Sequence, residues 1–169
     1  MEDDRPKRLW APWRMVYLRG ERKEDGCIFC NRIKAPAERD RENLVLFRGE
    51  RAFVIMNRYP YTSGHLMVAP VEHIADIEAL DDDTSLEIFN LIKRSVAVLK
   101  QAYSPHGFNI GANLGECAGA GIKDHIHFHI VPRWSGDTNF MPVLGEVRVV
   151  SQALEETYDE LIKFFRGEK

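Results

Sequence analysis

Three histidines stand at alternate positions in the sequence HIHFHI, residues 125 to 130, and they are half of the six histidines in the chain. Side chains alternate between the two faces of a strand, so His125, His127 and His129 are predicted to share one face. The apolar residues between them, Ile126 and Phe128, are predicted to face the core. Such a row of imidazoles can bind a metal ion, act on a substrate, or form a polar edge that faces solvent.

The spacing of the row favours catalysis over a three-histidine metal site. At about 3.3 Å per residue, the backbones of His125 and His129 lie about 13 Å apart, too far for one zinc ion to bind both without strain. A single histidine of the row can still join metal ligands from elsewhere. Neutral imidazole is a good nucleophile, and a phosphoryl centre is its obvious target. The Gly-rich segment GECAGAGIKD, residues 115–124, can offer backbone N–H groups to phosphate oxygens.

Short strands must position these histidines. Apolar runs with flanking turn residues predict strands at 44–47, 52–56, 65–69, 108–113 and 125–131. The links between neighbouring strands are short and resemble hairpins. The sequence therefore predicts the α+β class, with an antiparallel sheet of about five strands.

Two helices accompany the strands. Thr84 and Glu87 have the spacing of a capping box and predict the start of a long helix that reaches about residue 103. A second helix is predicted from near residue 151, and residues 21–43 are predicted to be a loop with a short turn. The stripe expected to be buried on the long helix consists of Leu86, Phe89, Leu91, Ile92, Val96 and Leu99.

Length, charge and cysteine content limit the class of protein. With 169 residues, the chain is long enough for one domain. A formal net charge of -3 gives no global basic field, so no nucleic-acid partner is expected. The N-terminus lacks the apolar region of a signal peptide and no apolar run could span a bilayer, so no membrane partner is expected. Three cysteines, an odd number, favour a reducing compartment and predict a cytoplasmic protein.

The sequence HIHFHIVPR, residues 125–133, resembles the signature of the histidine-triad (HIT) family. The segments FVIMNRYPYTSGHLMVAPVEH (53–73) and GFNIGANLGECAG (107–119) are also similar to that family. The resemblance covers residues 27–134 and implies an antiparallel sheet with helices, usually in a homodimer that joins two sheets. The chain is thus expected to be a single HIT-like domain, with an apolar N-terminal arm at 1–20 and a helical C-terminal extension at 135–169.

The resemblance also implies a chemistry. The middle histidine, His127, would attack the α-phosphate of a nucleotide and form a nucleotidyl-histidine. His129 would bind phosphate oxygens, and His65 would support the nucleophile from the neighbouring strand. Asn57 stands where the family contacts ribose, and Asn113 where it contacts phosphate or the leaving group.

One departure from the family pattern affects the expected reaction. Many family hydrolases carry Gln four residues before the first histidine of the triad, where this chain has Gly121. The backbone amides of Gly119 to Ile122 could replace its hydrogen bonds. The segments LWAPWRMVYL (9–18) and PRWSGDTNF (132–140) resemble the branch that contains dinucleoside-polyphosphate phosphorylases.

The expected activity is therefore cleavage of diadenosine tetraphosphate or a related adenine nucleotide, with inorganic phosphate favoured over water as the acceptor. Hydrolysis of such compounds, hydrolysis of adenosine phosphoramidates by the same histidine, and nucleotide binding without catalysis remain the alternatives. Magnesium is expected to accompany the polyphosphate, because no acidic cluster predicts a magnesium held by the protein.

A second group of chemically active residues is the CIFC motif, Cys27 and Cys30. A redox role requires a strand-to-helix turn in a parallel unit, which the pattern does not predict. A metal role requires two further ligands. The chain resembles family members that carry the same C-x-x-C motif. This resemblance implies that His73 and His125 are the two further ligands and that the bound metal is structural zinc. Two buried thiols without metal are the alternative.

Overall fold

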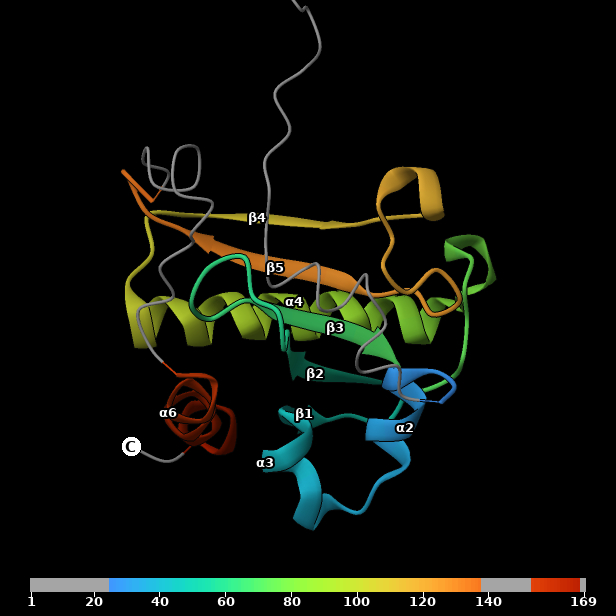
Figure 1. The fold of residues 1–169 in the computed structure, drawn as a ribbon, viewed down its shortest axis with the longest axis horizontal. Helices are drawn as coiled ribbons and strands as arrows, with labels where there is room; N and C mark the ends of the chain where they lie inside the picture. Colours follow the sequence, from blue (N-terminus) through green and yellow to red (C-terminus); the bar gives the residue numbers. More distant parts are fainter. Residues whose placement is uncertain (1–24, 138–152, 168–169) are drawn as a thin grey trace, which may run out of the picture.

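The computed structural model describes residues 25–137 and 153–167 and shows one antiparallel sheet of five strands (Figure 1). The order across the sheet is β1-β2-β3-β5-β4, and every neighbouring pair is antiparallel. The predicted α+β class is therefore confirmed. The strands are β1 (Val45–Arg48), β2 (Ala52–Met56), β3 (Leu66–Pro70), β4 (Gly107–Ala112) and β5 (Phe128–Arg133).

The helices surround this sheet. The prediction that residues 21–43 form a loop is wrong for most of its described part, because two helices and a 3-10 turn lie there. The predicted last helix is present, whereas residue 151 and the arm at 1–20 lie outside the described residues. The helices are α2 (Ile28–Lys34), α3 (Asp40–Asn43), α4 (Asp82–Tyr103) and α6 (Leu154–Arg166), with 3-10 turns η1 (Ala37–Arg39), η2 (Ile77–Ala79) and η3 (Glu116–Ala118).

The histidine strand begins later than its sequence predicts. β5 starts at Phe128, so only His129 of the three histidines lies on the hydrogen-bonded strand. Both neighbours stop supplying partners there, since Phe128 pairs with Ala112, the last residue of β4, and with Val68 of β3. The residues before β5 form other bonds instead, such as that from the Ile126 N–H to the carbonyl of residue 74, at 2.7 Å.

The start of α4 also differs from the prediction. The N-cap is Asp81, whose carboxylate accepts from the Thr84 N–H at 2.8 Å and from the Thr84 hydroxyl at 2.9 Å. The predicted capping box is wrong, because Glu87 accepts bonds from the N–H groups of Glu50 and Arg51 in the turn between β1 and β2, at 2.9 and 2.8 Å. The helix is thus tied to the turn, which fixes its rotation about its axis.

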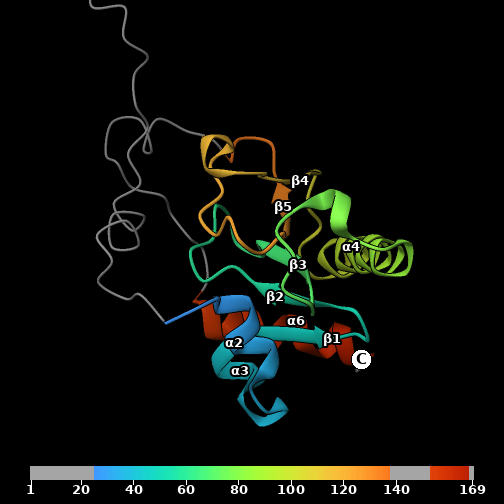
Figure 2. The ribbon, with the colours of Figure 1, turned by 90° about the vertical axis from the view of Figure 1, so that its right-hand side faces the viewer.

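In this rotation α4 packs against β2, β3 and β5 on one face of the sheet (Figure 2). Two members of the predicted stripe, Leu86 and Phe89, are 62% and 64% exposed, so the expectation that they are buried is wrong. Their positions lie on the flank of the helix that points away from the sheet. The residues that do face the sheet include Ile88, Leu91, Ile92, Val98 and Leu99.

The opposite face of the sheet carries the histidines. Residues that pair directly across strands point to the same face, so Ile55, Met67 and His129 form one row across β2, β3 and β5. Phe53 lies two residues before Ile55 on that same face and meets Phe29 of α2, with ring centroids 6.3 Å apart. α2 therefore covers the face that bears His129, and α4 covers the other.

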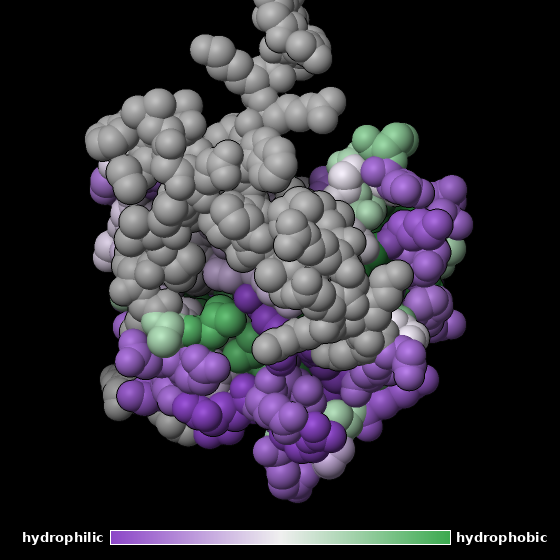
Figure 3. Space-filling view, in the orientation of Figure 1, coloured by the Kyte–Doolittle hydropathy of each residue, from purple (hydrophilic) through white to green (hydrophobic). Residues whose placement is uncertain are grey.

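Helix α6 packs against β1 and α4 (Figure 1). The Tyr158 hydroxyl donates to the carbonyl of Val45 at 3.0 Å, and Leu161 is fully buried. On the outside, Arg41 of α3 pairs with Asp159 at 2.8 Å, and the surface over α3 and α6 is mainly hydrophilic (Figure 3). Among the described residues, no helix has both the length and the apolar character needed to cross a membrane.

If α6 is part of the core, Leu161→Ala should lower the free energy of unfolding by about 2–5 kcal/mol, because it removes a fully buried side chain. The matched variant Lys163→Ala, on the exposed side of the same helix, should change it by less than about 0.5 kcal/mol. Urea unfolding followed by circular dichroism measures both. Equal effects of the two substitutions would contradict the packing of α6.

Candidate active site and metal cluster

His127 is held by a hydrogen bond to its own chain. Its Nδ1 lies 2.9 Å from the carbonyl oxygen of His125. A carbonyl oxygen can only accept, so Nδ1 carries the proton and Nε2 keeps a lone pair. Burial lowers the pKa of His127, which is only 6% exposed, and this favours the neutral ring. The result is an imidazole in the tautomer that can act as a nucleophile through Nε2.

His65 and His129 form a second, directional pair. The Tyr61 N–H donates to Nδ1 of His65 at 3.1 Å, so a neutral His65 carries its proton on Nε2. That Nε2 lies 3.0 Å from Nδ1 of His129 and donates to it. A neutral His129 then carries its proton on Nε2. The backbone at Tyr61 thereby makes His129 a hydrogen-bond donor through Nε2.

Two aromatic residues that the sequence analysis did not select complete the packing. The ring centroid of Phe29 lies 4.8 Å from that of His127, and the ring centroid of His129 lies 4.9 Å from it, so both rings pack against this imidazole. The ring of Tyr61 lies 4.6 Å from that of His65. Phe29 lies in CIFC and Tyr61 in RYPYTSGH, two motifs that the sequence already indicated as functional. An aromatic residue inside such a motif is the signal that could have identified both.

Asn57 directly follows β2 and lies beside His65. Its side-chain oxygen accepts from the Tyr59 N–H at 2.9 Å, and its Nδ2 is 3.4 Å from Nδ1 of His65. Its backbone N–H also donates to the His65 carbonyl at 3.0 Å. The structure thus brings together four of the predicted catalytic and binding residues: Asn57, His65, His127 and His129.

The other predicted binding residues lie on the connection from β4 to β5. Asn113 immediately follows β4. Gly119 has φ +88°, a conformation that favours glycine, and its N–H donates to the carbonyl of Glu116 at 3.0 Å. Gly121 is exposed, and Ile122 packs its side chain against the core. The N–H of Gly119 is therefore already bonded within the loop.

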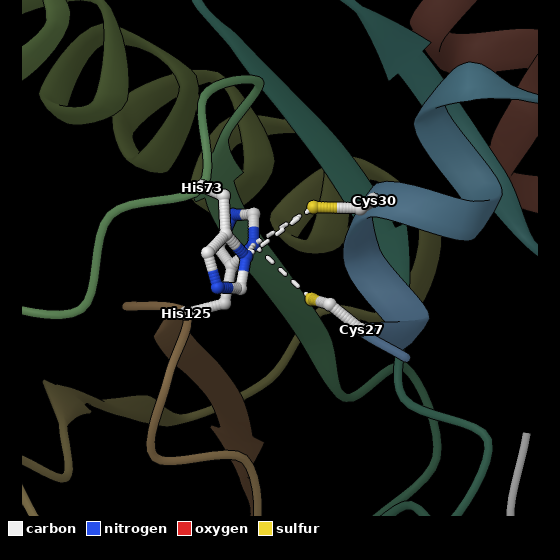
Figure 4. Close-up of side chains that lie close together, drawn as sticks. All are labelled: Cys27, Cys30, His73 and His125. Atoms are coloured by element: carbon white, nitrogen blue, oxygen red, sulfur yellow. Dashed lines mark hydrogen bonds between the residues drawn. The ribbon is translucent and has the colours of Figure 1, made fainter. Parts of the chain in front are cut away.

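The four predicted metal ligands lie together (Figure 4). Cys27 caps α2 and Cys30 lies in its first turn, while His73 follows β3 and His125 precedes β5. Sγ of Cys27 is 3.3 Å from Nδ1 of His125, and Sγ of Cys30 is 3.3 Å from Nδ1 of His73. Nδ1 of His125 also lies 3.7 Å from Sγ of Cys30 and 3.3 Å from Nδ1 of His73.

These distances fit a tetrahedral zinc ion. Bonds of about 2.0–2.3 Å give ligand-to-ligand edges of about 3.3–3.8 Å. Nε2 of His125 donates to the Pro70 carbonyl at 2.9 Å, so its Nδ1 is unprotonated and points into the cluster. Burial, with a contribution from Cys27, raises the pKa of Cys30, and a bound cation would favour the thiolate of this residue. The donor set of two thiols and two imidazoles suits zinc.

Comparisons with known proteins agree with this fold and site. The model of the HIT domain matches residues 38–136. The chain therefore belongs to the histidine-triad family. It is 39% identical over 163 residues to a Mycobacterium tuberculosis protein named AP-4-A phosphorylase, covering 91% of this chain and 82% of that protein. It is 31% identical over 107 residues to an adenosine 5′-monophosphoramidase from Schizosaccharomyces pombe, covering 63% of this chain and 74% of that protein.

Solved structures show the same fold. A zinc-bound histidine-triad family protein from Mycobacterium smegmatis superimposes with a TM-score of 0.66 at 25% identity, over 84% of this chain and 94% of that one. A hypothetical histidine-triad nucleotide-binding protein from Sulfolobus tokodaii gives a TM-score of 0.63 at 29% identity, over 83% of this chain and 90% of that one. The expected HIT-like fold is thus confirmed.

Proposed function

We propose that this protein cleaves dinucleoside polyphosphates, such as diadenosine tetraphosphate, through a nucleotidyl-histidine intermediate on His127. The observation that carries the proposal is the hydrogen bond from Nδ1 of His127 to the His125 carbonyl, which leaves Nε2 free of its proton beside His129. The similarity to a protein named AP-4-A phosphorylase supports the substrate class and the choice of phosphate as acceptor.

In the first displacement, Nε2 of His127 attacks the α-phosphorus. A nitrogen–phosphorus bond forms, and the bond from phosphorus to the leaving polyphosphate oxygen breaks. The ring becomes positively charged, and its Nδ1–H remains bonded to the His125 carbonyl. The hydrogen bond from His65 orients the ring of His129. His129 then donates from Nε2 to the oxygens on phosphorus as negative charge develops there.

In the second displacement, an oxygen of inorganic phosphate attacks the same phosphorus. The nitrogen–phosphorus bond breaks and its electron pair returns to Nε2 of His127. Diadenosine tetraphosphate would yield ATP in the first step and ADP in the second. We expect Asn57 to contact ribose and Asn113 a phosphate, with the backbone from Gly119 to Ile122 near the polyphosphate and magnesium arriving with the substrate.

A second candidate is hydrolysis of adenosine phosphoramidates. The similarity to an adenosine 5′-monophosphoramidase favours it, and the same attack by His127 would serve. The leaving group is then an amine, and water is the acceptor. The chemistry of the first step does not separate the two candidates, but their products do.

The test is incubation with diadenosine tetraphosphate, with and without inorganic phosphate, and separation of the nucleotides. We expect ADP plus ATP only when phosphate is present. His127→Ala should lower turnover by about 10⁴-fold or more, because it removes the nucleophile. His106→Gln, an exposed histidine outside the site, is the matched control and should turn over normally.

Other product patterns have definite meanings. AMP plus ATP regardless of phosphate would make the protein a hydrolase. Turnover that survives His127→Ala would end the covalent mechanism. Absence of turnover on the dinucleotide, with cleavage of adenosine phosphoramidate, would favour the second candidate. Nucleotide binding without cleavage of either compound would favour a binding module.

We further propose that Cys27, Cys30, His73 and His125 hold structural zinc. The support is the set of distances among their ligand atoms and the zinc-bound relative from Mycobacterium smegmatis. The ion would join the first turn of α2 to the segments after β3 and before β5. It would link distant parts of the chain, and its binding energy would add to the stability of the fold.

Removal of zinc with a chelator should therefore lower the melting temperature by about 5–10 °C, the shift expected for loss of a ligand present at about 100 times its dissociation constant. Cys27→Ser should lower the zinc content measured by atomic absorption. Cys117→Ser, an exposed cysteine outside the cluster, is the control and should retain it. Wild-type protein purified without zinc and unaffected by the chelator would exclude the ion.

We also propose a homodimer that forms at β4. This strand ends the described sheet, and α4 packs against the strands before it. Ile110 of β4 points to the face that α4 covers, because it pairs with Ile130, yet it is 49% exposed. Leu114, just beyond the strand, is 46% exposed. A second copy that adds its own β4 would satisfy the backbone of this edge and cover these side chains.

Ile110→Lys should convert a dimer to monomers, because the interface would then bury an unpaired charge. Sedimentation velocity measures the change. Gln101→Lys adds the same charge to an exposed position of α4 and serves as the control. A wild-type protein that sediments as a monomer at high micromolar concentration would refute the proposal.

A further inference from the structure

The segment that carries His127 lies outside the ladder of backbone hydrogen bonds that β5 forms with its neighbours. β5 begins at Phe128, so His125 and His127 precede its ladder of hydrogen bonds. Hydrogen bonds to Pro70, the last residue of β3, and to Ile74 beyond it help to hold the segment. Nε2 of His125 donates to the Pro70 carbonyl at 2.9 Å, and the N–H of Ile126 donates to the Ile74 carbonyl at 2.7 Å. The position of the nucleophile therefore depends on contacts around His125 rather than on strand pairing.

His125 faces two sites at once. Its Nδ1 points into the cluster of Cys27, Cys30 and His73, and its carbonyl oxygen accepts from Nδ1 of His127. The ring and the carbonyl belong to one residue, so an ion that restrains the ring would also restrain the backbone of His125. Because this carbonyl accepts from Nδ1 of His127, such a restraint would favour the tautomer with an unprotonated Nε2.

Phe29 provides a second connection. It stands between Cys27 and Cys30 in the first turn of α2, so an ion bound by both thiolates would pin the turn that carries it. Its fully buried ring lies 4.8 Å from that of His127 and 5.1 Å from that of His125. The Phe29 ring thus packs against the imidazole of His127, as does the ring of His129, with centroids 4.9 Å apart.

We propose that the metal cluster is a positioning device for the nucleophile: when loaded, it holds His127, through the His125 carbonyl and the Phe29 ring, in the tautomer with the proton on Nδ1. The inference rests on the proposed function, because it assigns the cluster an influence on that reaction. Loss of the ion would lower the rate of nucleotidyl transfer, since a ring protonated on Nε2 cannot attack phosphorus through that nitrogen. It would leave nucleotide binding near Asn57 almost unchanged.

The first measurement does not need turnover. Long-range proton–nitrogen correlation spectra of the histidine rings report which nitrogen of His127 carries the proton. They are recorded on zinc-loaded protein, on protein stripped by a chelator, and after zinc is added back. The His127 signals are assigned by their loss in His127→Ala. We expect the Nδ1–H tautomer alone in loaded protein, a mixture of tautomers in stripped protein, and recovery on addition of zinc.

The second measurement separates rate from binding. His73→Gln removes the exposed ligand of the cluster and leaves the active-site side chains in place. We expect it to lose zinc and to lower kcat about tenfold or more, with the dissociation constant for AMP changed by less than about twofold. His106→Gln is the matched control, and it should retain zinc, tautomer and kcat.

Phe29→Leu tests the second connection and leaves all four metal ligands in place. It remains informative if the stripped protein unfolds, and circular dichroism would detect that unfolding. It should keep its zinc but lower kcat and yield mixed tautomers of His127. Folded, stripped protein with an unchanged tautomer and kcat would overturn the inference, as would a Phe29→Leu variant that behaves like wild type. If loaded protein cleaves no nucleotide, the proposed function fails, while the tautomer spectra still decide whether the cluster positions His127.

Discussion

The bond between Nδ1 of His127 and the carbonyl of His125 is the constraint on which the rest of the site depends. It assigns the proton of one imidazole, and the chemistry follows from that assignment. A carbonyl oxygen is a suitable partner because it never donates, so the tautomer is fixed without another titrating group. Burial acts in the same direction, because it lowers the pKa of His127 and disfavours a second proton.

The sheet supports this bond because different helices cover its two faces. α4 packs on one face and supplies most of the helix-to-sheet core, with its rotation fixed by Glu87 at the turn between β1 and β2. The other face is covered by α2, which brings Phe29 to the imidazoles. Stability and reactivity are thus placed on opposite sides of one sheet. Changes on the α4 side can alter stability with little effect on the geometry of the histidines.

Periodicity was enough to predict the sheet and the face that bears His129. The alternation in HIHFHI placed His129 on the face opposite Phe128 and Ile130, as the structure has it. Strand ends were predicted less well, because β5 begins where β3 and β4 stop providing partners, which depends on segments distant in sequence. The burial of Leu86 and Phe89 was mispredicted for a similar reason. The apolar stripe was broader than the contact surface, and the Glu87 contacts fix which part of it faces the sheet.

The site was predictable in its residue types but not in its proton positions. The spacing of Cys27 and Cys30 indicated a metal or redox role, and the family resemblance indicated His73 and His125 as partners, which the structure brings together. The tautomers of His65 and His127 follow from backbone groups at Tyr61 and His125, and a sequence pattern does not show where such groups point. Helix α2 was not predicted because it has only seven residues and contacts the core mainly through Phe29, which is too short a pattern to show helical periodicity.

The packing of α6 against β1 has a consequence for how the protein can associate. An open β-sheet with two free edges can add copies at both ends and grow into a filament. Here Tyr158 and Leu161 place a helix against β1, which leaves β4 as the accessible end of the described sheet. In the proposed dimer, two copies that meet through β4 would consume both accessible ends. The C-terminal helix would then make the assembly self-limiting, as a closed pair that does not grow into a fibre.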